Sequence, residues 1–235
     1  MRGRLFLIPS TISDSQANHV IPEYVGKIIS NITHYIVENE RTARRMLIKL
    51  GISIPIDDLT FYILNKHTSK SDIPDFLNIA ESEDIGLLSE AGVPAVADPG
   101  REVVSLAHKK NIKVVPLVGP SSILLALMAS GLNGQNFAFV GYLPVKSQER
   151  IRKIKEIEIR SKFENQSQIF IEAPYRNNQL LNDILITCGN STLLCLAINI
   201  TGENERIETH AIEYWRKHKP DVHKKPAIFI LHKMD

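Results

Sequence analysis

The stretch IGLLSEAGVPAVADPG, residues 85–100, joins a short apolar run to a loop of small residues, prolines and acids. Ile85–Leu88 has the length and composition of a buried strand, and a helical pattern at Glu102–Lys110 follows the loop. That pattern ends in lysines, which suit the negative end of a helix dipole, and a branched run at Val114–Leu117 comes next. A strand, a helix and another strand in this order favour a largely parallel sheet covered by helices.

The same alternation runs back toward the N-terminus. The sequence predicts strands at Leu5–Ile8, Tyr35–Val37 and Phe61–Leu64, with helices at Thr42–Leu50 and Ile73–Ser82. Gly51 stops the first helix, and Pro74 lies near the start of the second, where a missing N–H costs nothing. We therefore expect an N-terminal α/β domain over residues 1–118, with a mostly parallel sheet and flanking helices.

The second half keeps the alternation but connects some of its strands by shorter loops. Strands are predicted at Phe137–Val140, Gln168–Ile171, Leu193–Ile198, Arg206–His210 and Ala227–Leu231, with helices at Ser121–Ala129, Gln148–Arg160 and Asn177–Thr187. The connection over residues 200–205 is too short for a crossover helix, so antiparallel neighbours are expected there. The expected fold is α/β in two domains, the second covering residues 119–235 with a mixed sheet and helices.

Composition places the chain among ordinary globular proteins. Apolar residues make up 43% of the 235 residues and charged residues 23%, which argues against disorder, collagen and coiled coil. The longest purely apolar run, Ile123–Ala129, is too short to cross a bilayer, and residues 1–9 lack the hydrophobic stretch of a secretory signal. We therefore expect a cytoplasmic protein without a membrane segment. The net charge of +2 neither requires nor excludes a nucleic-acid partner.

Several kinds of site are excluded by their missing motifs. Two cysteines rule out a disulfide scaffold and a cysteine-rich metal site, and Cys195 lies in an apolar run where a buried thiol is expected. The eight histidines show no metal-ligand spacing, so no metal is predicted. The dinucleotide glycine fingerprint, the phosphate-binding Gly-Lys-Ser/Thr loop and the Gly-x-Ser-x-Gly nucleophile motif are all absent from the sequence.

What remains is a set of loops that follow predicted strands. Open α/β sheets bind ligands at the carboxyl ends of their strands, where Glu38–Thr42, Ser89–Gly100 and Gly119–Ser122 are expected. Small residues and prolines in Ser89–Gly100 allow a ligand to approach the backbone while the loop stays stiff. Each loop also has a purely structural interpretation, as a rigid connector or as the cap of a following helix.

These loops, taken in order with two further segments, resemble a known family. Ser89–Pro94 and Asp98–Gly100 are similar to its Ser-Asp-Ala-Gly-Thr-Pro…Asp-Pro-Gly loop, and Glu172–Arg176 is similar to Glu-Ser-Pro/Thr-His-Arg. The other matching segments are Glu38–Thr42, Val114–Ser121 and Gly141–Ser147 with Arg150. The chain thus resembles the tetrapyrrole-methylase superfamily of S-adenosylmethionine-dependent methyltransferases. It is most similar to the branch that methylates a ribose 2′-hydroxyl of a cytidine in small-subunit ribosomal RNA.

The resemblance implies a homodimer whose S-adenosylmethionine lies in a cleft between the two domains of each chain. Carried over by position, the segment around Gly92 would hold the methionine part, and residues of the second half would enclose the adenosine. The implied cofactor-binding residues are Ala91, Gly92, Val93, Val96, Ser121, Ser122, Ile171, Glu172, Ile200, Pro226 and Ala227. A mostly apolar pocket with few directed polar groups is what such a ligand requires.

The resemblance also assigns catalytic and substrate-binding roles. Glu38 would act as the base that takes the proton of the ribose hydroxyl, and Arg41 would hold a phosphate or orient that carboxylate. Lys146, Arg150 and Arg176, with the basic helix at residues 148–162, would contact the phosphates of ribosomal RNA or of the small ribosomal subunit. A structural Glu38–Arg41 ion pair at a helix start and a merely solvated basic helix remain the alternatives.

Departures from the family pattern keep other functions open. The first loop, Ser10–Asp14, lacks the glycines found there in both branches, and only Thr201 remains of the segment Arg-Glu-Leu-Thr. One alternative is a methyltransferase acting on a tetrapyrrole or another small molecule. Another is a descendant that binds the cofactor or RNA without activity.

Overall fold

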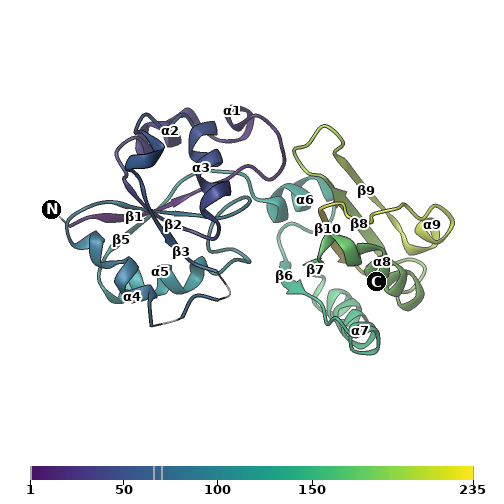
Figure 1. Cartoon of the computed structure of the whole chain (residues 1–235). Coiled ribbons are helices and arrows are strands. Elements are labelled where there is room, and N and C mark those ends of the chain that lie inside the picture. The colour runs from purple at the N-terminus through teal and green to yellow at the C-terminus, as the bar shows by residue number, and fades with distance from the viewer. Residues whose placement is uncertain (1, 66, 70, 235) are drawn as a thin grey trace. The chain divides into compact units, whose positions relative to one another are not determined.

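The computed structural model describes residues 2–65, 67–69 and 71–234 (Figure 1). The chain forms two compact units, unit 1 over residues 1–121 and unit 2 over residues 122–235. The boundary predicted from the sequence, between residues 118 and 119, lies slightly before this division. Among the described residues, no helix is both long enough and apolar enough to span a membrane.

Unit 1 is built on a parallel sheet with the strand order β3-β2-β4-β1-β5. Its strands are β1 (Arg4–Ile8), β2 (His34–Val37), β3 (Thr60–Ile63), β4 (Ile85–Leu88) and β5 (Lys113–Pro116). Every residue of the central strand β4 is buried, as a sheet covered on both faces requires. Each strand lies within a residue of its predicted position, because short branched runs between turn signals define strands locally.

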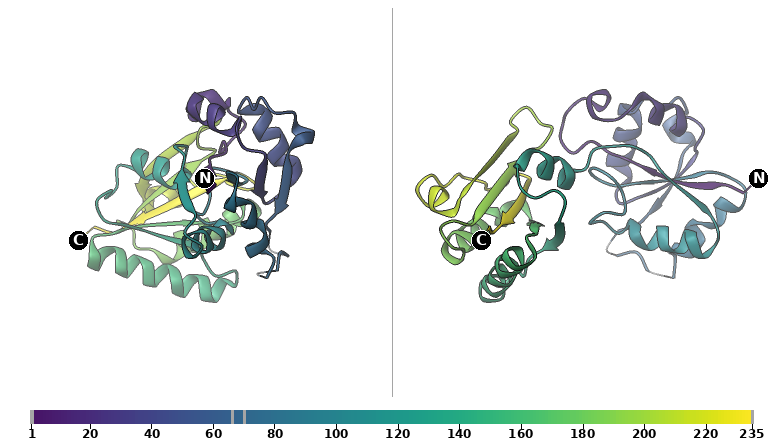
Figure 2. Two further views of the ribbon diagram at one scale, coloured as in Figure 1. Left: turned by 90° about the vertical axis from the view of Figure 1, so that its left-hand side faces the viewer. Right: turned by 180° about the vertical axis from the view of Figure 1, so that it is seen from behind.

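Helices cover both faces of this sheet (Figures 1 and 2). One core cluster packs Val25, Ile29 and Leu47, from α2 and α3, against the sheet. The opposite cluster packs Ile73 and Val103, from α4 and α5, against the other face. The helical segments are α1 (Ala17–Val20), α2 (Glu23–Ile29), α3 (Glu40–Lys49), η1 (Ile56–Asp58), α4 (Ile73–Phe76), η2 (Asn78–Glu81) and α5 (Gly100–Lys109).

The order of the strands creates a switch point between β2 and β4. After β2 the chain passes through α3 to β3, on one side, whereas after β4 it passes through α5 to β5, on the other. The two connections therefore diverge from neighbouring strands, whose last residues Val37 and Leu88 are paired. In open α/β sheets the crevice outside such a point is where ligands bind.

Unit 2 contains a mixed sheet with the order β6-β7-β10-β8-β9. The pair β6–β7 is parallel and the remaining pairs are antiparallel, which confirms the antiparallel pairing predicted across residues 200–205. The strands are β6 (Phe137–Tyr142), β7 (Ser167–Ile171), β8 (Leu193–Ile198), β9 (Arg206–Ala211) and β10 (Ala227–His232). The sheet therefore has the mixed character expected from the sequence.

The two faces of this second sheet are covered unequally. One face packs against Ile154, Leu181 and Trp215, from three helices, whereas the other packs against Ala126 and Leu127 of α6. The helical segments of unit 2 are α6 (Ser122–Ser130), α7 (Ser147–Glu164), η3 (Pro174–Arg176), α8 (Asn177–Thr187) and α9 (Ile212–Lys217). Cys195 lies fully buried in the α6 cluster, as predicted.

Some helical predictions were wrong or missing. The single helix predicted at Ile73–Ser82 is instead the short α4 followed by η2, with Leu77 at their junction and fully buried. Helices α1, α2 and α9 were not predicted, since each is short and gives few repeats of the 3.6-residue pattern. Their apolar residues, such as Val25 in α2 and Trp215 in α9, are fixed by packing against the sheets.

Candidate functional site

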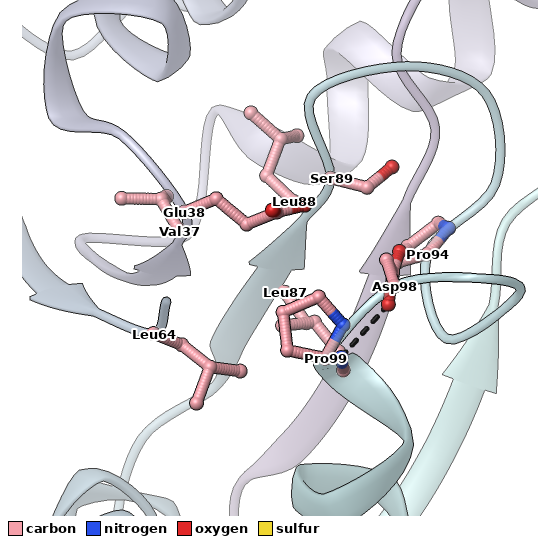
Figure 3. A pocket seen from close by; sticks show the side chains of 10 residues that line it. Val37, Glu38, Leu64, Leu87, Leu88, Ser89, Pro94, Asp98 and Pro99 are labelled. Atoms are coloured by element: carbon pink, nitrogen blue, oxygen red, sulfur yellow. Dashed lines mark hydrogen bonds between the residues drawn. The ribbon is translucent and has the colours of Figure 1, made fainter. Parts of the chain in front are cut away.

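A small pocket lies at the switch point of unit 1 (Figure 3). Its walls are apolar side chains, and two acids, Glu38 and Asp98, join them from the ends of β2 and of the loop after β4. A second small pocket shares Val37, Leu88 and Ser89 with the first and extends to Thr42 and Glu90. The crevice expected from the strand order is therefore present, with ionisable groups in it.

The two acids of the pocket are held in an environment that disfavours their charge. Partial burial raises the pKa of Glu38, and the nearby carboxylates of Asp98 and Glu90 raise it further. A hydrogen bond from the backbone of Glu90 acts in the opposite direction. Burial also raises the pKa of Asp98, whose Oδ1 accepts hydrogen bonds from the amides of Ala95 (2.9 Å) and Gly100 (2.8 Å). A carboxylate with a raised pKa is better suited to accept a proton.

The loop after β4 forms a rigid cradle beside this pocket. The amide of Ser10 donates to the carbonyl of Gly92 (2.8 Å), the Gly92 amide donates back (3.2 Å), and Ser10 Oγ donates to the Ser89 carbonyl (2.7 Å). Gly92, Ala95 and Ala97 all have positive φ. Left-handed backbone at an alanine costs about 1–2 kcal/mol, so two such residues in one loop mark strain of the kind stored at functional sites.

A glycine in the loop after β5 lets two backbone segments of unit 1 lie against each other. A Cβ added to Gly119 would lie 2.1 Å from Pro9 Cβ, so only glycine fits against the β1 loop. A Cβ on Gly92 would lie 3.2 Å from the Pro120 carbonyl oxygen. The loops after β1, β4 and β5 therefore pack backbone to backbone at one edge of the sheet.

The segment that follows β2 caps helix α3. Asn39 has an extended backbone, and its Oδ1 accepts from the amides of Arg41 (2.9 Å) and Thr42 (3.2 Å). Thr42 Oγ1 donates to Glu90 Oε1 (2.5 Å) and so joins the helix start to the β4 loop. Arg41 is exposed and makes no ion pair with any residue that the structure describes, Glu38 included. The structural Glu38–Arg41 ion pair, one of the two interpretations drawn from the sequence, is therefore not formed.

In unit 2 three strand ends bring predicted cofactor residues together. Ile171 at the end of β7 is paired with Ile228, and Ala227 at the start of β10 is paired with Ile198 at the end of β8. The Asn199 amide donates to the Pro226 carbonyl (3.0 Å), which places Ile200 just beyond the same edge. Segments far apart in the sequence, predicted to enclose an adenosine, are thus neighbours in the sheet.

Glu172 introduces a buried charge at this edge. Its side chain is only 1% exposed, and its Oε1 accepts from Arg176 Nη2 and from the Ala173 amide, both at 2.6 Å. Glu172 Oε2, Arg176 Nε and Asn177 Oδ1 are buried without a hydrogen-bond partner in the protein. A buried acceptor left unpaired costs about 1–3 kcal/mol, so this edge is suited to a ligand that supplies donors.

The three predicted substrate-binding residues have very different surroundings. Lys146 is well exposed, with Glu149 Oε1 at 3.5 Å from its Nζ. Arg150 is 3% exposed; it forms an ion pair with Asp183 (Nη2–Oδ2, 2.6 Å) and donates to the Val145 carbonyl (2.7 Å). Arg176 bonds Glu172 and stacks on Tyr175. The guanidinium of Arg150 is committed to the interior, which does not favour its prediction as an RNA contact.

Comparison with known proteins identifies the family. No family model matches the chain. A protein from Vibrio cholerae serotype O1, named ribosomal RNA small subunit methyltransferase I, is 30% identical over 205 residues, covering 87% of this chain and 67% of the relative. The chain belongs to this methyltransferase family. It spans about two thirds of the length of the curated relatives it matches.

Solved structures show that the fold is shared with other members of the superfamily. The methyltransferase CobJ has a TM-score of 0.65 at 13% identity, covering 98% of this chain and 94% of that one. Uroporphyrin-III C-methyl transferase from Thermus thermophilus, complexed with S-adenyl homocysteine, has a TM-score of 0.57 at 16% identity, with 98% of each chain covered. The predicted α/β tetrapyrrole-methylase fold and the predicted S-adenosylmethionine-dependent methyltransferase class are confirmed.

The structure also adds groups for which no role in this methyltransferase was predicted from the sequence. Asp98 lines the pocket and ties its loop together, although the sequence marked it only as part of a motif. Ser10 holds Gly92, and Asp183 holds Arg150. The spacing Asp-Pro-Gly before a helix was the one available signal for Asp98. In the part of the chain that the structure describes, no cluster of three or more histidines, cysteines or acids is suited to hold a metal ion.

Proposed function

We propose that the protein transfers a methyl group from S-adenosylmethionine to a ribose 2′-hydroxyl of small-subunit ribosomal RNA. The observation that carries this is the half-buried Glu38 carboxylate in a pocket at the switch point, beside the strained loop around Gly92. The name of the relatives supports ribosomal RNA as the acceptor. The ribose 2′-hydroxyl is proposed as the group methylated because the Glu38–Thr42 segment resembles the branch of the family that methylates this hydroxyl.

The residues of each unit fit S-adenosylmethionine. In unit 1, Ala91, Gly92, Val93 and Val96 offer small side chains on a stiff backbone, and Ser121 follows the tightly packed Gly119. In unit 2, the unpartnered Glu172 Oε2 is an acceptor for a hydroxyl or amine of an adenosine. The remaining proposed contacts are Ser122, Ile171, Ile200, Pro226 and Ala227.

In the proposed reaction the protein aligns the reacting groups and accepts a proton. When bound, S-adenosylmethionine would supply a methyl group on a sulfonium, and the neutral thioether S-adenosylhomocysteine would be the leaving group. Glu38 takes the proton of the ribose hydroxyl, and its raised pKa makes it a better proton acceptor than an ordinary carboxylate. The low polarity of Leu64, Leu87 and Leu88 around it limits competing hydration of the carboxylate.

The RNA backbone is proposed to contact cations outside the pocket. Arg41 follows Glu38 by three residues and has its guanidinium free of ion pairs to described residues, so it can bind a phosphate. Lys146 and Arg176 follow β6 and β7, which are parallel and end at the same edge of the unit 2 sheet. Arg150 stays a prediction for this surface, although its pairing with Asp183 favours a structural role.

We further propose that the protein acts as a homodimer in the cytoplasm, where ribosomal subunits are found. Helix α6 is apolar on all sides, and its Leu124 and Met128 are exposed. An apolar helix of this kind normally lies buried, which supports an interface with a second copy. Light scattering coupled to gel filtration tests this, since a molar mass near 26 kDa in dilute solution would contradict it.

Calorimetric titration with S-adenosylhomocysteine tests the cofactor site. The wild-type chain is expected to bind, and Ala91→Trp is expected to lose binding, because Ala91 is an exposed small residue in the cradle. Ser105→Trp, which adds the same bulk on the exposed side of α5, serves as the control and should bind normally. Absence of binding to the wild-type chain would contradict every methyltransferase version of the proposal.

Methyl transfer to small ribosomal subunits tests the acceptor. Subunits from a strain that lacks this protein are incubated with methyl-labelled S-adenosylmethionine, and the RNA is digested to nucleosides. We expect the label in a 2′-O-methylated nucleoside. Label on a base, or on an added tetrapyrrole and not on the subunits, would contradict the proposal. If both Glu38→Gln and Arg41→Ala leave turnover intact, the catalytic assignment is wrong.

A further inference from the structure

Helix α7 carries a stripe of residues that neither the core nor the proposed pocket uses. The α7 stripe consists of Arg152, Lys155, Ile159, Lys162 and Phe163, spaced at i, i+3, i+7, i+10 and i+11. At 3.6 residues per turn they lie along one side of the helix, opposite its buried residues. Ile159 is 68% exposed and Phe163 is 89% exposed. Two large apolar side chains thus project into solvent between three cations.

The cations of the stripe have no acidic partners. The glutamates of α7 are engaged elsewhere: Glu149 with Lys146 (3.5 Å), Glu156 with Lys153 (2.6 Å), Glu164 with Arg160 (3.0 Å) and Glu158 with the Gly189 amide (2.8 Å). Arg152, Lys155 and Lys162 make no ion pair with any described residue. The stripe therefore carries three uncompensated positive charges along about 15 Å of helix.

This combination fits single-stranded RNA better than a protein partner. Lysine and arginine bind phosphates, and an exposed aromatic ring offers a face on which an unstacked base can lie. An apolar groove on a protein would remove the three cations from water without pairing them, which is costly. A second copy docked through the same stripe would oppose six unpaired cations. Charge complementarity therefore selects a polyanion that also exposes flat apolar surfaces.

We propose that the α7 stripe binds a single-stranded segment of RNA, with Phe163 stacked on a base and Arg152, Lys155 and Lys162 on phosphates. The inference rests on the proposed function, since it names a surface that holds the RNA substrate. The α7 stripe belongs to unit 2 and the Glu38 pocket to unit 1, so substitutions in the stripe leave the residues that line the pocket unchanged. Base-stacked duplex offers Phe163 no free base face, so single strands are preferred.

Fluorescence anisotropy of labelled RNA tests the stacking. The probes are a fluorescein-labelled single-stranded RNA of about 20 nucleotides and a hairpin duplex of equal length and composition. Phe163→Ala is expected to weaken binding of the single strand about tenfold, as loss of one base–aromatic stack implies, and to leave duplex binding nearly unchanged. The control is Ile186→Ala, which removes another exposed apolar side chain, on α8.

Salt dependence tests the phosphate contacts. Arg152→Ala/Lys155→Ala/Lys162→Ala is expected to make the slope of log K against log salt shallower by about 2, since each single-strand contact contributes about 0.7. The control is Lys49→Ala/Lys109→Ala/Lys113→Ala, which removes the same charge from exposed positions of unit 1 and should change the slope little. All substituted side chains are exposed, so the variants are expected to fold.

The outcomes separate this inference from the proposed function. An unchanged single-strand affinity for Phe163→Ala would overturn it, and so would an equal loss in the matched charge control. Binding of the wild-type chain to anionic phospholipid vesicles in preference to RNA would overturn it as well. If methyl transfer to subunits is normal in both stripe variants at low substrate concentration, the proposed RNA-binding role of the stripe is wrong and the proposed function is supported. If the stripe binds RNA but no methyl transfer occurs, the proposed function fails alone.

Discussion

The ion pair between Arg150 and Asp183 allows the role of Arg150 to be decided by stability measurements. The Arg150 side chain is 4% exposed and the Asp183 side chain 13%, and two nitrogens of the guanidinium lie 2.6 and 2.7 Å from Asp183 Oδ2. Replacing Asp183 by leucine leaves a buried guanidinium with only the carbonyl acceptors of the β6–α7 loop, such as Val145. Removing one partner of such a pair costs about 3–5 kcal/mol.

Replacing both partners should restore much of the stability. In Arg150→Met/Asp183→Leu no charge remains buried, and apolar side chains of similar length fill the space between α7 and α8. We expect this double variant to be more stable than Asp183→Leu by about 2 kcal/mol or more, because the unpaired charge is the main penalty. The free energy of unfolding is then larger in the variant with two substitutions than in the variant with one, the reverse of simple additivity.

Urea unfolding followed by tryptophan fluorescence measures these differences in unit 2. Trp215 is the only tryptophan of the chain and lies buried in the same cluster as Ile154 of α7 and Leu181 of α8. Equal slopes of free energy against urea would show that only stability has changed. The reasoning is refuted if Asp183→Leu costs less than about 1 kcal/mol, or if Arg150→Met keeps full stability while the KM for ribosomal subunits rises.

Three further predictions concern the pocket, the sheet of unit 2 and a close backbone contact. Glu38→Gln should lower methyl transfer about 10²- to 10⁴-fold. Because the pKa of Glu38 is raised in the folded chain, the same variant should unfold at a higher temperature than the wild-type chain at neutral pH. This gain in stability should disappear below the ordinary carboxylate pKa. A Glu38→Gln variant with lower neutral-pH stability would contradict this sign. Burial lowers the pKa of His232, so the free energy of unfolding of unit 2 should fall as the pH drops below the ordinary histidine pKa. His232→Gln should make this pH dependence weaker in urea titrations followed by Trp215 fluorescence. An unaltered pH profile in the variant would show that another group is responsible. Gly119→Ala should destabilise unit 1 by about 1–3 kcal/mol in thermal unfolding, because the added Cβ would meet Pro9. Gly134→Ala should leave the stability unchanged, because open space surrounds Gly134. Equal melting temperatures of the two variants would contradict the proposed contact.

The strands of both sheets were predictable because their signals are local. Runs such as Ile85–Leu88 and Leu193–Ile198 are short, apolar and bounded by turn residues, and the structure places strands there. The alternation with helices was enough to predict a parallel sheet in the first half. Loops at the carboxyl ends of these strands, including Ser89–Gly100, were recognised as candidate sites for the same reason.

Strand order, in contrast, is a property of the tertiary structure. Nothing in the sequence near β2 and β4 indicates that they are neighbours with diverging connections, yet this arrangement creates the pocket that holds Glu38 and Asp98. The short helices α2 and α9 were missed because packing of Val25 and Trp215 stabilises them more than any local pattern.

Charged residues show the difference most clearly. The sequence by itself determined that Arg150 and Lys155 are basic residues of one helix, and it determined the motifs that identify the family. Only the tertiary structure decided that Arg150 turns inward to Asp183 while Lys155 stays in solvent without a partner. The physical reason is that a charge acts over a few ångströms of space, and its neighbours there come from distant parts of the chain.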